Sequence, residues 1–380
     1  MGFKKLVYFM LSMIKESTQN ALERYFAMNG EDVFMTQQAF SLARQKVKWE
    51  AFREMFEFTV ATHYKINETL RWDGYRLLGI DGSKLALPND KPLLAYFGGR
   101  GADKGSPTAQ GSILYDILND VVMDALIDPA KTGEQTQARE HIKHLQGLES
   151  FEGGKELIIF DRGYASRELI QGLMDKKIDY LMRVRTKFSK EIDALGLGVH
   201  PLELEHGKKR IPLRVIKLEL DSGETETLIT SLKDTKYAVE DFKWLYFKRW
   251  PIETKYDAIK KKLEVENFSG KLADNIRQDF YATMTLANIA ADFYREAQAD
   301  VEAEQEQKEN KYQYQVNVSH EIGVLKDRLV KTLIEDDYKK RGAMFDEILA
   351  LLKKKLIPIS NLKFSHRSQE RHEQTDNTAL

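Results

Sequence analysis

Two acidic side chains end apolar segments of the sequence. Asp81 closes the run LLGID, and Asp161 closes the run LIIFD. In mixed or parallel sheets, ligands gather at the carboxyl ends of strands, so carboxylates placed there tend to be functional. For either aspartate alone, a cap of the following turn is the preferred explanation, since Asp-Gly and Asp-Arg-Gly are turn-prone. Two such acids in one sheet favour a shared site.

A third acid that could join this site is Glu253. It follows Pro251, which stands where a helix can begin, so we expect Glu253 in the first helical turn. Carboxylate oxygens are the ligands that Mg²⁺ prefers, and three acids would complete a two-metal phosphodiester site with ions about 3.5–4 Å apart. Lys260 lies two turns further on the same helical face, where an ammonium group would meet a phosphate backbone.

The segment around Glu253 is locally basic although the chain as a whole is not. Residues 243–262 hold seven Lys or Arg against two acids, whereas the chain has 58 Lys and Arg against 59 Asp and Glu. The local excess favours a polyanionic partner, and interleaved aromatic side chains suit base stacking as well as core packing. These aromatic residues are Trp244, Tyr246, Phe247, Trp250 and Tyr256. An amphipathic helix with a solvated basic side is the alternative explanation.

The elements that must position these residues form an α/β pattern. After a helical region over residues 1–70, the order is β-β-β-α-β-α-β, a mixed sheet with helices beside it. The strands are expected near 76–88, 111–118, 121–129, 155–161 and 179–188, with a hairpin turn at Asn119-Asp120. Residues 191–234 read as a small β insertion, 238–300 and the region up to 355 as helices, and the tail as disordered.

The composition excludes several kinds of chemistry. The chain has no Cys, which rules out disulfides, thiolate zinc sites and cysteine nucleophiles and fits a reducing cytoplasm. The first residues superficially resemble a signal peptide but lack a small-residue cleavage site, so we expect a cytoplasmic protein. His141 and His144 fall in an expected helix with no acidic partner placed for a metal site, which favours surface histidines. The glycine-rich segment 97–107 is interpreted either as a flexible loop near a ligand or as a series of ordinary turns.

One helix near the N-terminus carries polar side chains that could read DNA. Gln and Arg can pair with adenine and guanine edges in the major groove, and a solvated polar face over an apolar stripe is the alternative. The residues expected to project from this helix are Gln37, Gln38, Ser41, Arg44, Lys46 and Lys48.

Tyr246, Arg249, Glu253 and Lys260 fit the pattern Y-x2-R-x3-E-x6-K without a gap. This pattern resembles the signature of DDE-class bacterial insertion-sequence transposases of the insertion-sequence-four type. The segments DGSKLALP around Asp81 and FDRGY around Asp161 are similar to the other two acidic blocks of that family. The order Asp, Asp, Glu and the β insertion before the Glu also match, and the resemblance covers roughly residues 36–270.

The resemblance implies an RNase H-like catalytic domain in which Asp81, Asp161 and Glu253 bind two Mg²⁺ ions, for which Mn²⁺ can substitute. It implies hydrolysis at transposon ends and transesterification into target DNA by a homodimer. The implied DNA contacts are made by Tyr246, Arg249, Lys260, Trp250, Arg44 and Lys46.

The implied division of the chain has three parts. Residues 1–72 form a helical DNA-binding region, 73–300 the catalytic domain with its insertion, and 301–380 a helical C-terminal region with a disordered tail. Two alternatives remain open: a catalytically silent DNA-binding protein derived from a transposase, and an RNase H-like nuclease without strand transfer.

Overall fold

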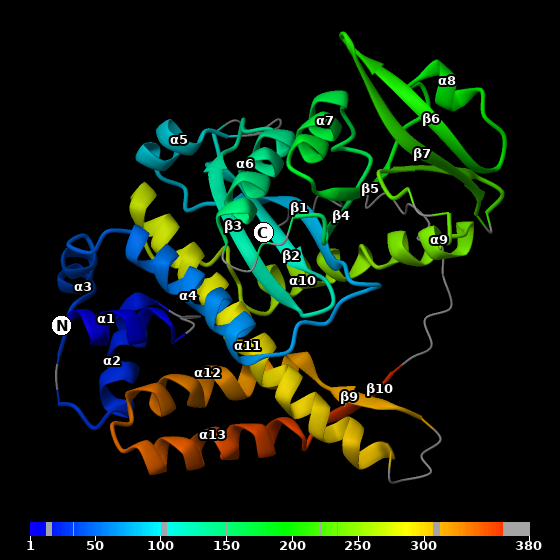
Figure 1. The fold of residues 1–380 in the computed structure, drawn as a ribbon. Helices are drawn as coiled ribbons and strands as arrows, with labels where there is room; N and C mark the ends of the chain where they lie inside the picture. Colours follow the sequence, from blue (N-terminus) through cyan, green and yellow to red (C-terminus); the bar gives the residue numbers. More distant parts are fainter. Residues whose placement is uncertain are drawn as a thin grey trace, which may run out of the picture.

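The computed structural model of the chain describes residues 1–12, 17–32, 34–99, 105–148, 151, 153–220, 222–233, 235–306 and 312–359. An eight-stranded mixed sheet forms its centre (Figure 1). The strands are β1 (Arg76–Ala86), β2 (Thr108–Asp116), β3 (Val121–Pro129), β4 (Glu156–Phe160), β5 (Asp179–Arg183), β6 (Gly198–His206), β7 (Lys209–Glu219) and β8 (Thr225–Thr230). A second, two-stranded sheet pairs β9 (Tyr314–Val316) with β10 (Leu356–Pro358).

The order of the first five strands identifies the fold. They lie side by side as β3-β2-β1-β4-β5. The pairs β1–β2 and β2–β3 are antiparallel, whereas β4 and β5 continue the sheet in parallel with β1. This arrangement defines the RNase H-like fold, so the predicted fold class, an RNase H-like mixed sheet flanked by helices, is confirmed. The β2–β3 hairpin turns at Asn119-Asp120, as the sequence predicted.

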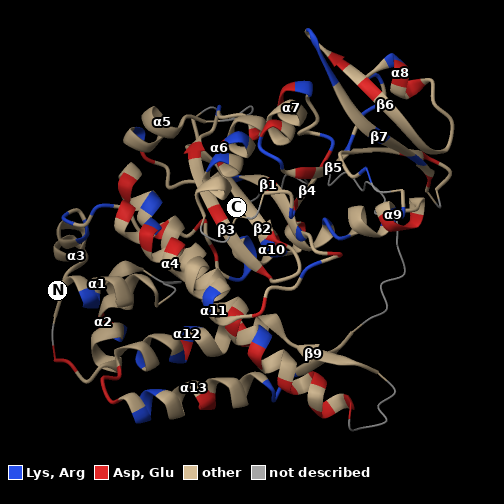
Figure 2. Ribbon diagram, in the orientation of Figure 1, with Lys and Arg blue, Asp and Glu red and all other residues tan. Residues whose placement is uncertain are grey.

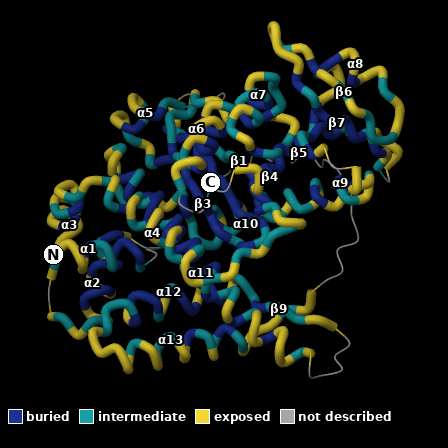
Figure 3. The backbone as a smooth tube through the Cα atoms, in the orientation of Figure 1, coloured by how far each residue is buried: buried dark blue, intermediate teal, exposed yellow. Residues whose placement is uncertain are grey.

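Helices cover both faces of these five strands. On one face, α6 (Glu134–Gly147) packs against β1, β2 and β3, and α7 (Arg167–Asp175) packs against α6 and β5. On the other face lie α4 (Glu50–Ile66), α10 (Trp250–Lys261) and α11 (Ala273–Glu306). Because successive strand residues point to opposite faces, each central strand contributes to both cores. Strands β2 and β4 and the first half of β1 are accordingly buried (Figure 3).

The remaining helices flank this centre. The N-terminal group consists of α1 (Phe3–Met10), α2 (Thr18–Met28) and α3 (Gln37–Arg44). The other short helices are α5 (Lys91–Phe97), α8 (Lys190–Asp193) and α9 (Val239–Phe247). The C-terminal group consists of α12 (Val318–Ile334) and α13 (Tyr338–Leu352), which lie side by side next to the second half of α11 (Figure 1). No helix in the described ranges is long and apolar enough to cross a bilayer.

The predicted β insertion forms β6, β7 and β8, which extend the central sheet because β8 pairs with β5. Three expectations from the sequence need correction. Asp81 does not end its strand, because β1 continues past it to Ala86. The boundary placed at residue 300 falls inside α11, which continues to Glu306. The N-terminal polar helix ends at Arg44, so Lys46 and Lys48 lie beyond it. The expected disorder of the tail falls on residues outside those described.

Glu321 is an acid buried where α12 packs against the rest of the molecule. Its side chain is 2% exposed, and one carboxyl oxygen has no hydrogen-bond partner among the described residues. Burial raises the pKa of Glu321 to about 8, and Asp120 adds to this, while Lys255 and Lys262 act in the opposite direction. Glu321 is therefore protonated at neutral pH in the folded protein.

This protonation makes stability depend on pH. Between pH 4.5 and about 8 the folded state holds a proton that the unfolded state has lost, so the free energy of unfolding falls as pH rises through this window. The contribution is about 1.4 kcal/mol per pH unit. We expect Glu321→Gln to flatten the pH dependence by that slope in urea unfolding at pH 5, 6.5 and 8. The exposed Glu296→Gln is the control, and equal slopes in all three proteins would contradict the assignment.

Candidate active site

The register of two neighbouring strands places Asp81 beside Asp161. Strands β1 and β4 run parallel with Arg76 opposite Glu156, and the pairing continues to Gly79 opposite Ile159. Asp81 lies five residues after Arg76, and Asp161 lies five residues after Glu156. The same offset on both strands brings the two carboxylates to the same level at the sheet's carboxyl end. This juxtaposition was predicted from the apolar runs that each aspartate closes.

A buried ion pair fixes that register. Arg76 donates from Nε to Oε2 of Glu156 at 2.9 Å and from Nη2 to Oε1 at 2.6 Å, and both residues are 0% exposed. Two parallel hydrogen bonds between charged groups are strong and geometrically specific. A shift of β4 along β1 would leave both charges unpaired in the interior, at a cost of several kcal/mol. The pair therefore selects one alignment of the two strands that carry the aspartates.

Asp81 lies in a partly buried position close to other charges. Its Oδ1 accepts a hydrogen bond from the Gly82 backbone N–H at 2.9 Å. Burial raises the pKa of Asp81 to about 6; Glu253 and Glu134 raise it further, while the Gly82 N–H and Arg249 oppose the rise. A carboxyl group whose pKa is raised by burial and by neighbouring acids is a common feature of functional sites.

The helix α10 delivers Glu253 to the same region. Ile252 of α10 packs against β1 at Gly79, where an added Cβ would lie 3.3 Å from the Ile252 Cδ1. The glycine thus allows close approach of the helix that carries the third acid. Glu253 forms an ion pair with Arg249 one turn earlier, and Arg249 also lies close enough to lower the pKa of Asp81.

Each residue of the Y-R-E-K signature contacts an acidic segment. The Tyr246 hydroxyl donates to Oδ1 of Asp161 at 3.1 Å, and Arg249 binds Glu253. Lys260 donates to the Ser83 hydroxyl at 3.1 Å and to the Lys84 carbonyl at 2.9 Å, just after Asp81. The signature therefore ties α9 and α10 to all three acids.

Several other basic side chains in residues 243–262 bind acidic or aromatic side chains of the protein itself. Lys255 binds Asp120 at 2.8 Å, Lys261 binds Asp257 at 2.8 Å, and Lys248 lies over the Trp244 ring at 4.9 Å. Trp250 begins α10 and is 45% exposed. The basic excess noted in the sequence is thus partly neutralised, and Trp250 remains accessible at the edge of the site.

Arg44 has a structural position that the sequence did not predict. Its side chain is 1% exposed and donates to Asp279 at 2.8 Å, Ser269 at 2.7 Å and Gln278 at 2.9 Å. Buried and bonded in this way, Arg44 cannot reach a base edge, so the expectation of a DNA contact is wrong for this residue. Its ion pair joins α3 to α11 instead. Lys46 is exposed beyond the end of α3.

The two histidines of α6 are also not surface residues without acidic partners. His141 is 0% exposed; its Nδ1 lies 2.7 Å from Oδ2 of Asp124, and its Nε2 lies 2.9 Å from the Ser112 hydroxyl. His144 Nδ1 reaches the same Asp124 oxygen at 2.9 Å. Burial opposes ionisation of Asp124, but the hydrogen bonds from both imidazoles prevail and lower its pKa to about 2. Asp124 precedes His141 by 17 residues and lies on β3, so a search for acids at helical spacing could not find it.

Glu134 is a site residue that the sequence analysis missed. It begins α6 and is exposed. Its Oε2 lies 3.5 Å from the position of a Cβ on Gly163, two residues after Asp161. Its Cγ lies 3.6 Å from the position of a Cβ on Gly82, next to Asp81. The sequence feature that could have indicated Glu134 is its place in the first turn of the helix that follows the third strand.

The donor types at this site suit a hard divalent cation. Asp81, Asp161 and Glu253 supply carboxylate oxygens, the ligands that Mg²⁺ and Mn²⁺ prefer. Within the described ranges, no three Asp, Glu or His side chains are converged closely enough to hold an ion as placed. Arg249 pairs with Glu253, and Tyr246 binds Asp161, so these two contacts would have to rearrange when an ion binds.

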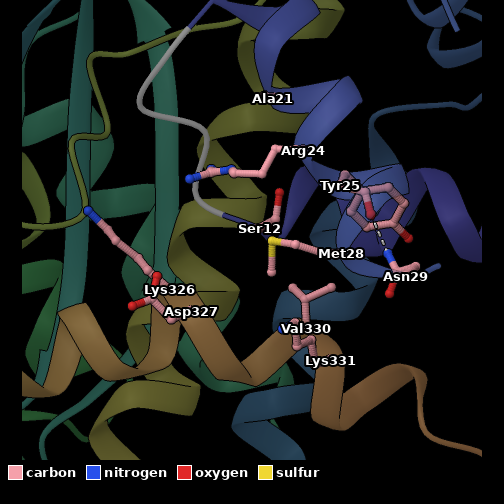
Figure 4. A pocket seen from close by; sticks show the side chains of 10 residues that line it. All are labelled: Ser12, Ala21, Arg24, Tyr25, Met28, Asn29, Lys326, Asp327, Val330 and Lys331. Atoms are coloured by element: carbon pink, nitrogen blue, oxygen red, sulfur yellow. Dashed lines mark hydrogen bonds between the residues drawn. The ribbon is translucent and has the colours of Figure 1, made fainter. Parts of the chain in front are cut away.

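A pocket elsewhere on the molecule does not include these acids. It lies between α2 and α12, where Arg24 and Met28 face Lys326 and Val330 (Figure 4). Asn29 donates to the Tyr25 carbonyl at 2.7 Å beside it. Its lining offers no group of acids or nucleophiles, so we assign it no catalytic role.

The RNase H-like sheet thus carries one acid within β1, a second directly after the neighbouring β4, and a third on the later helix α10. The chain matches the family described as transposase DDE domain over residues 72–289, more than half of its length. The protein therefore belongs to the DDE transposase domain family.

Two individual proteins are similar to the chain. Transposase InsG for insertion sequence element IS4 of Escherichia coli strain K12 is 23% identical over 280 residues, which are 68% of this chain and 61% of that protein. The chain thus spans less than two thirds of that relative. The cryo-EM structure of a piggyBac transposase synaptic complex with hairpin DNA aligns with 93% of this chain and 77% of its own chain, at 11% identity and a TM-score of 0.49.

Removing one partner of the Arg76–Glu156 pair tests its role in the fold. We expect Arg76→Met to lower the free energy of unfolding by about 3–5 kcal/mol, because it removes both charge-assisted hydrogen bonds that the buried Glu156 carboxylate accepts from Arg76. The double variant with Glu156→Leu is expected to recover most of the loss, as measured by urea unfolding. Arg53→Met removes an arginine from a more exposed pair on α4 and should cost less than about 1 kcal/mol. Equal losses in the single and double variants would contradict this role.

Proposed function

We propose that this protein is a DNA transposase that cleaves phosphodiester bonds at transposon ends and joins the freed ends to target DNA. The observation that carries the proposal is the set of contacts made by the four signature residues. Tyr246 binds Asp161, Lys260 binds Ser83 in the segment after Asp81, and Arg249 pairs with Glu253. A chance match to the signature would not be expected to place its residues on the other two acids. Family membership over residues 72–289 supports the same activity.

Asp81, Asp161 and Glu253 would hold two Mg²⁺ ions, for which Mn²⁺ can substitute. Such ions supply Lewis-acid stabilisation of the attacking and leaving oxygens in phosphodiester chemistry. Tyr246 holds the Asp161 carboxylate in place through its hydroxyl. Arg249 holds Glu253 and would exchange this acid for a DNA phosphate, since its bidentate guanidinium suits either anion. Lys260 orders the segment that follows Asp81.

The DNA partner is proposed from the charge and exposure around the acids. Trp244 and Trp250 are 41% and 45% exposed, and Lys248 lies over the Trp244 ring, a combination suited to phosphate and base contact. Lys208 and Lys209 at the end of the β6–β7 hairpin are exposed, and the hairpin projects from the body with a basic tip (Figure 2). We propose that these surfaces face DNA and that a homodimer works on paired ends, because each active site acts on one end.

A cleavage assay tests the proposal. The substrate is plasmid DNA carrying the gene with its native flanks, incubated with the full chain and Mg²⁺ or Mn²⁺. We expect cuts at defined ends followed by joined products, and a loss of about 100-fold or more in Glu253→Gln, which removes one carboxylate charge at nearly constant volume. The control Asp257→Asn alters an exposed acid one turn further along α10 and should cleave like the wild type.

The other outcomes separate the alternatives. Metal-dependent nicking without joined products would identify a nuclease without strand transfer. Binding of the ends without cleavage by any of the proteins would identify a silent DNA-binding protein. Cleavage that persists in Glu253→Gln would show that the third acid has been assigned to the wrong residue.

A further inference from the structure

The last part of β1 extends beyond its neighbour β4. The two strands pair only as far as Gly79, whereas β1 continues to Ala86 beside β2. Arg76 donates its backbone N–H to Lys155 on the β4 side, so the even-numbered residues of β1 direct their backbone groups toward that side. Over residues 80–86 the described part of the chain places no strand there. We call this side of residues 80–86 the open edge of β1.

Side chains take the place of a neighbouring strand along the open edge. A strand edge presents N–H and C=O groups that need hydrogen-bond partners. The three contacts, in chain order, are Gly82 N–H to Asp81 Oδ1 at 2.9 Å, Lys260 Nζ to the Lys84 carbonyl at 2.9 Å, and Ala86 N–H to Glu266 Oε1 at 2.8 Å. Lys260 thus supplies a donor and Glu266 an acceptor, as a strand would. Glu266 belongs neither to the signature nor to the acidic segments.

Glu266 and Lys260 are also paired with each other. The Oε1 atom that accepts from Ala86 lies 3.4 Å from the Lys260 ammonium, and the two side chains are 35% and 26% exposed. Lys260 donates to the Ser83 hydroxyl at 3.1 Å as well. A lysine side chain is a flexible four-carbon stem, so its ammonium is confined only where several partners act together. The carboxylate is the charged member of this set, and removal of its charge leaves the ammonium with neutral acceptors alone.

The loop that follows α10 holds Glu266 in this position. Glu264 has a φ of 52°, in the left-handed region, which reverses the chain direction. Val265 is 3% exposed, and its N–H donates to the Ile259 carbonyl of α10 at 3.2 Å. The Asn267 N–H closes a turn on the Glu264 carbonyl at 2.8 Å. The backbone on both sides of Glu266 is therefore fixed against the end of the helix.

We propose that Glu266 is a positioning residue of the active site, which holds the Lys260 ammonium at the open edge of β1 and so fixes where this cation meets a DNA phosphate. This rests on the proposed function, since it assigns to Lys260 a phosphate of the DNA that the protein cleaves. Glu266 acts through Lys260 and touches no reacting group itself. Its carboxylate orders the ammonium before DNA arrives, and ordering in advance reduces the entropy lost on binding.

The rate at which Lys260 is acetylated tests the ion pair in the full chain without DNA. Only the neutral amine reacts, and a carboxylate at 3.4 Å favours the ammonium. We expect Glu266→Gln, which keeps an oxygen for the Ala86 N–H, to raise the rate at Lys260 about 2-fold to 5-fold, the range for a partly exposed pair. Lys261, paired with Asp257 at 2.8 Å, is the internal reference in the same digest and should keep its rate. Equal Lys260 rates in the two proteins would overturn the proposal.

Cleavage kinetics test the consequence for the reaction. With Mg²⁺ and plasmid DNA carrying the native flanks, we expect Glu266→Gln to lower the rate at saturating DNA about 10-fold, within the about 100-fold that a misplacement of 1 Å can cost. The DNA concentration for half-maximal rate should stay equal or fall, since one negative charge is removed beside the DNA. Asp274→Asn removes the charge of a 65% exposed acid at the start of α11 and should cleave like the wild type.

A double-mutant cycle shows whether Glu266 acts through Lys260. Lys260→Met keeps a long side chain without the charge, and in this background Glu266→Gln should lower the cleavage rate no further. An equal fall in both backgrounds would contradict a role that depends on Lys260. The acetylation rates decide the pairing even where Lys260→Met cleaves too slowly for the cycle.

Hydrogen exchange separates the two contacts of Glu266. The peptide that contains Ala86 should be equally protected in the wild type and in Glu266→Gln, and should exchange faster in Glu266→Ala, which removes the acceptor of the Ala86 N–H. Faster exchange in Glu266→Gln together with slower cleavage would assign the effect to the strand instead of to Lys260, and would also overturn the proposal.

The outcomes separate this role of Glu266 from the proposed function. Wild-type cleavage and wild-type Lys260 reactivity in Glu266→Gln would overturn the positioning role and leave the transposase activity standing. Absence of metal-dependent cleavage by the wild-type protein would overturn the proposed function and with it the DNA contact of Lys260.

Discussion

The buried pair of Arg76 and Glu156 is the constraint on which the site depends. Parallel strands need a specified register, because a slip of one residue turns every side chain to the other face of the sheet. Apolar contacts specify register weakly where β1 pairs with β4, since Leu77–Gly79 and Leu157–Ile159 carry no polar side chain that would distinguish one alignment from a shifted one. One charge on each strand, with no water available, removes that ambiguity. The aspartates five residues downstream are aligned as a consequence.

The other elements of the site are fixed by contacts with these two aligned segments. Helix α10 is attached by Ile252 on Gly79 and by Lys260 on the segment after Asp81. Helix α9 is attached by Tyr246 on Asp161. The signature is therefore a set of contacts within the protein as well as a candidate surface for phosphate, and its spacing reflects the geometry of two consecutive helices over one sheet edge. Arg249 differs from the other signature residues, because it pairs with Glu253, which is itself part of the signature.

The fold and the acids could be predicted from sequence where the information is local. Asp81 and Asp161 stand at the ends of apolar runs, and Pro251 marks the start of the helix that holds Glu253. Partners distant along the chain could not be predicted. Arg44 read as a surface cation because Asp279, which buries it, follows 235 residues later. The pairing of β8 with β5 could not be predicted either, because nothing in the residues of β8 shows that β5 is its neighbour.

His141 shows why a polar helical face was misread. Histidines on a helix usually face solvent, and only the opposing Asp124 and Ser112 make burial favourable, by satisfying both ring nitrogens. An apolar stripe would stabilise α6 equally well in several positions along the sheet, whereas directional hydrogen bonds are satisfied in one. The hydrogen bonds from Gln137, His141 and His144 of α6 to β2 and β3 therefore fix the position of a helix, as the Arg76–Glu156 pair fixes the register of a strand.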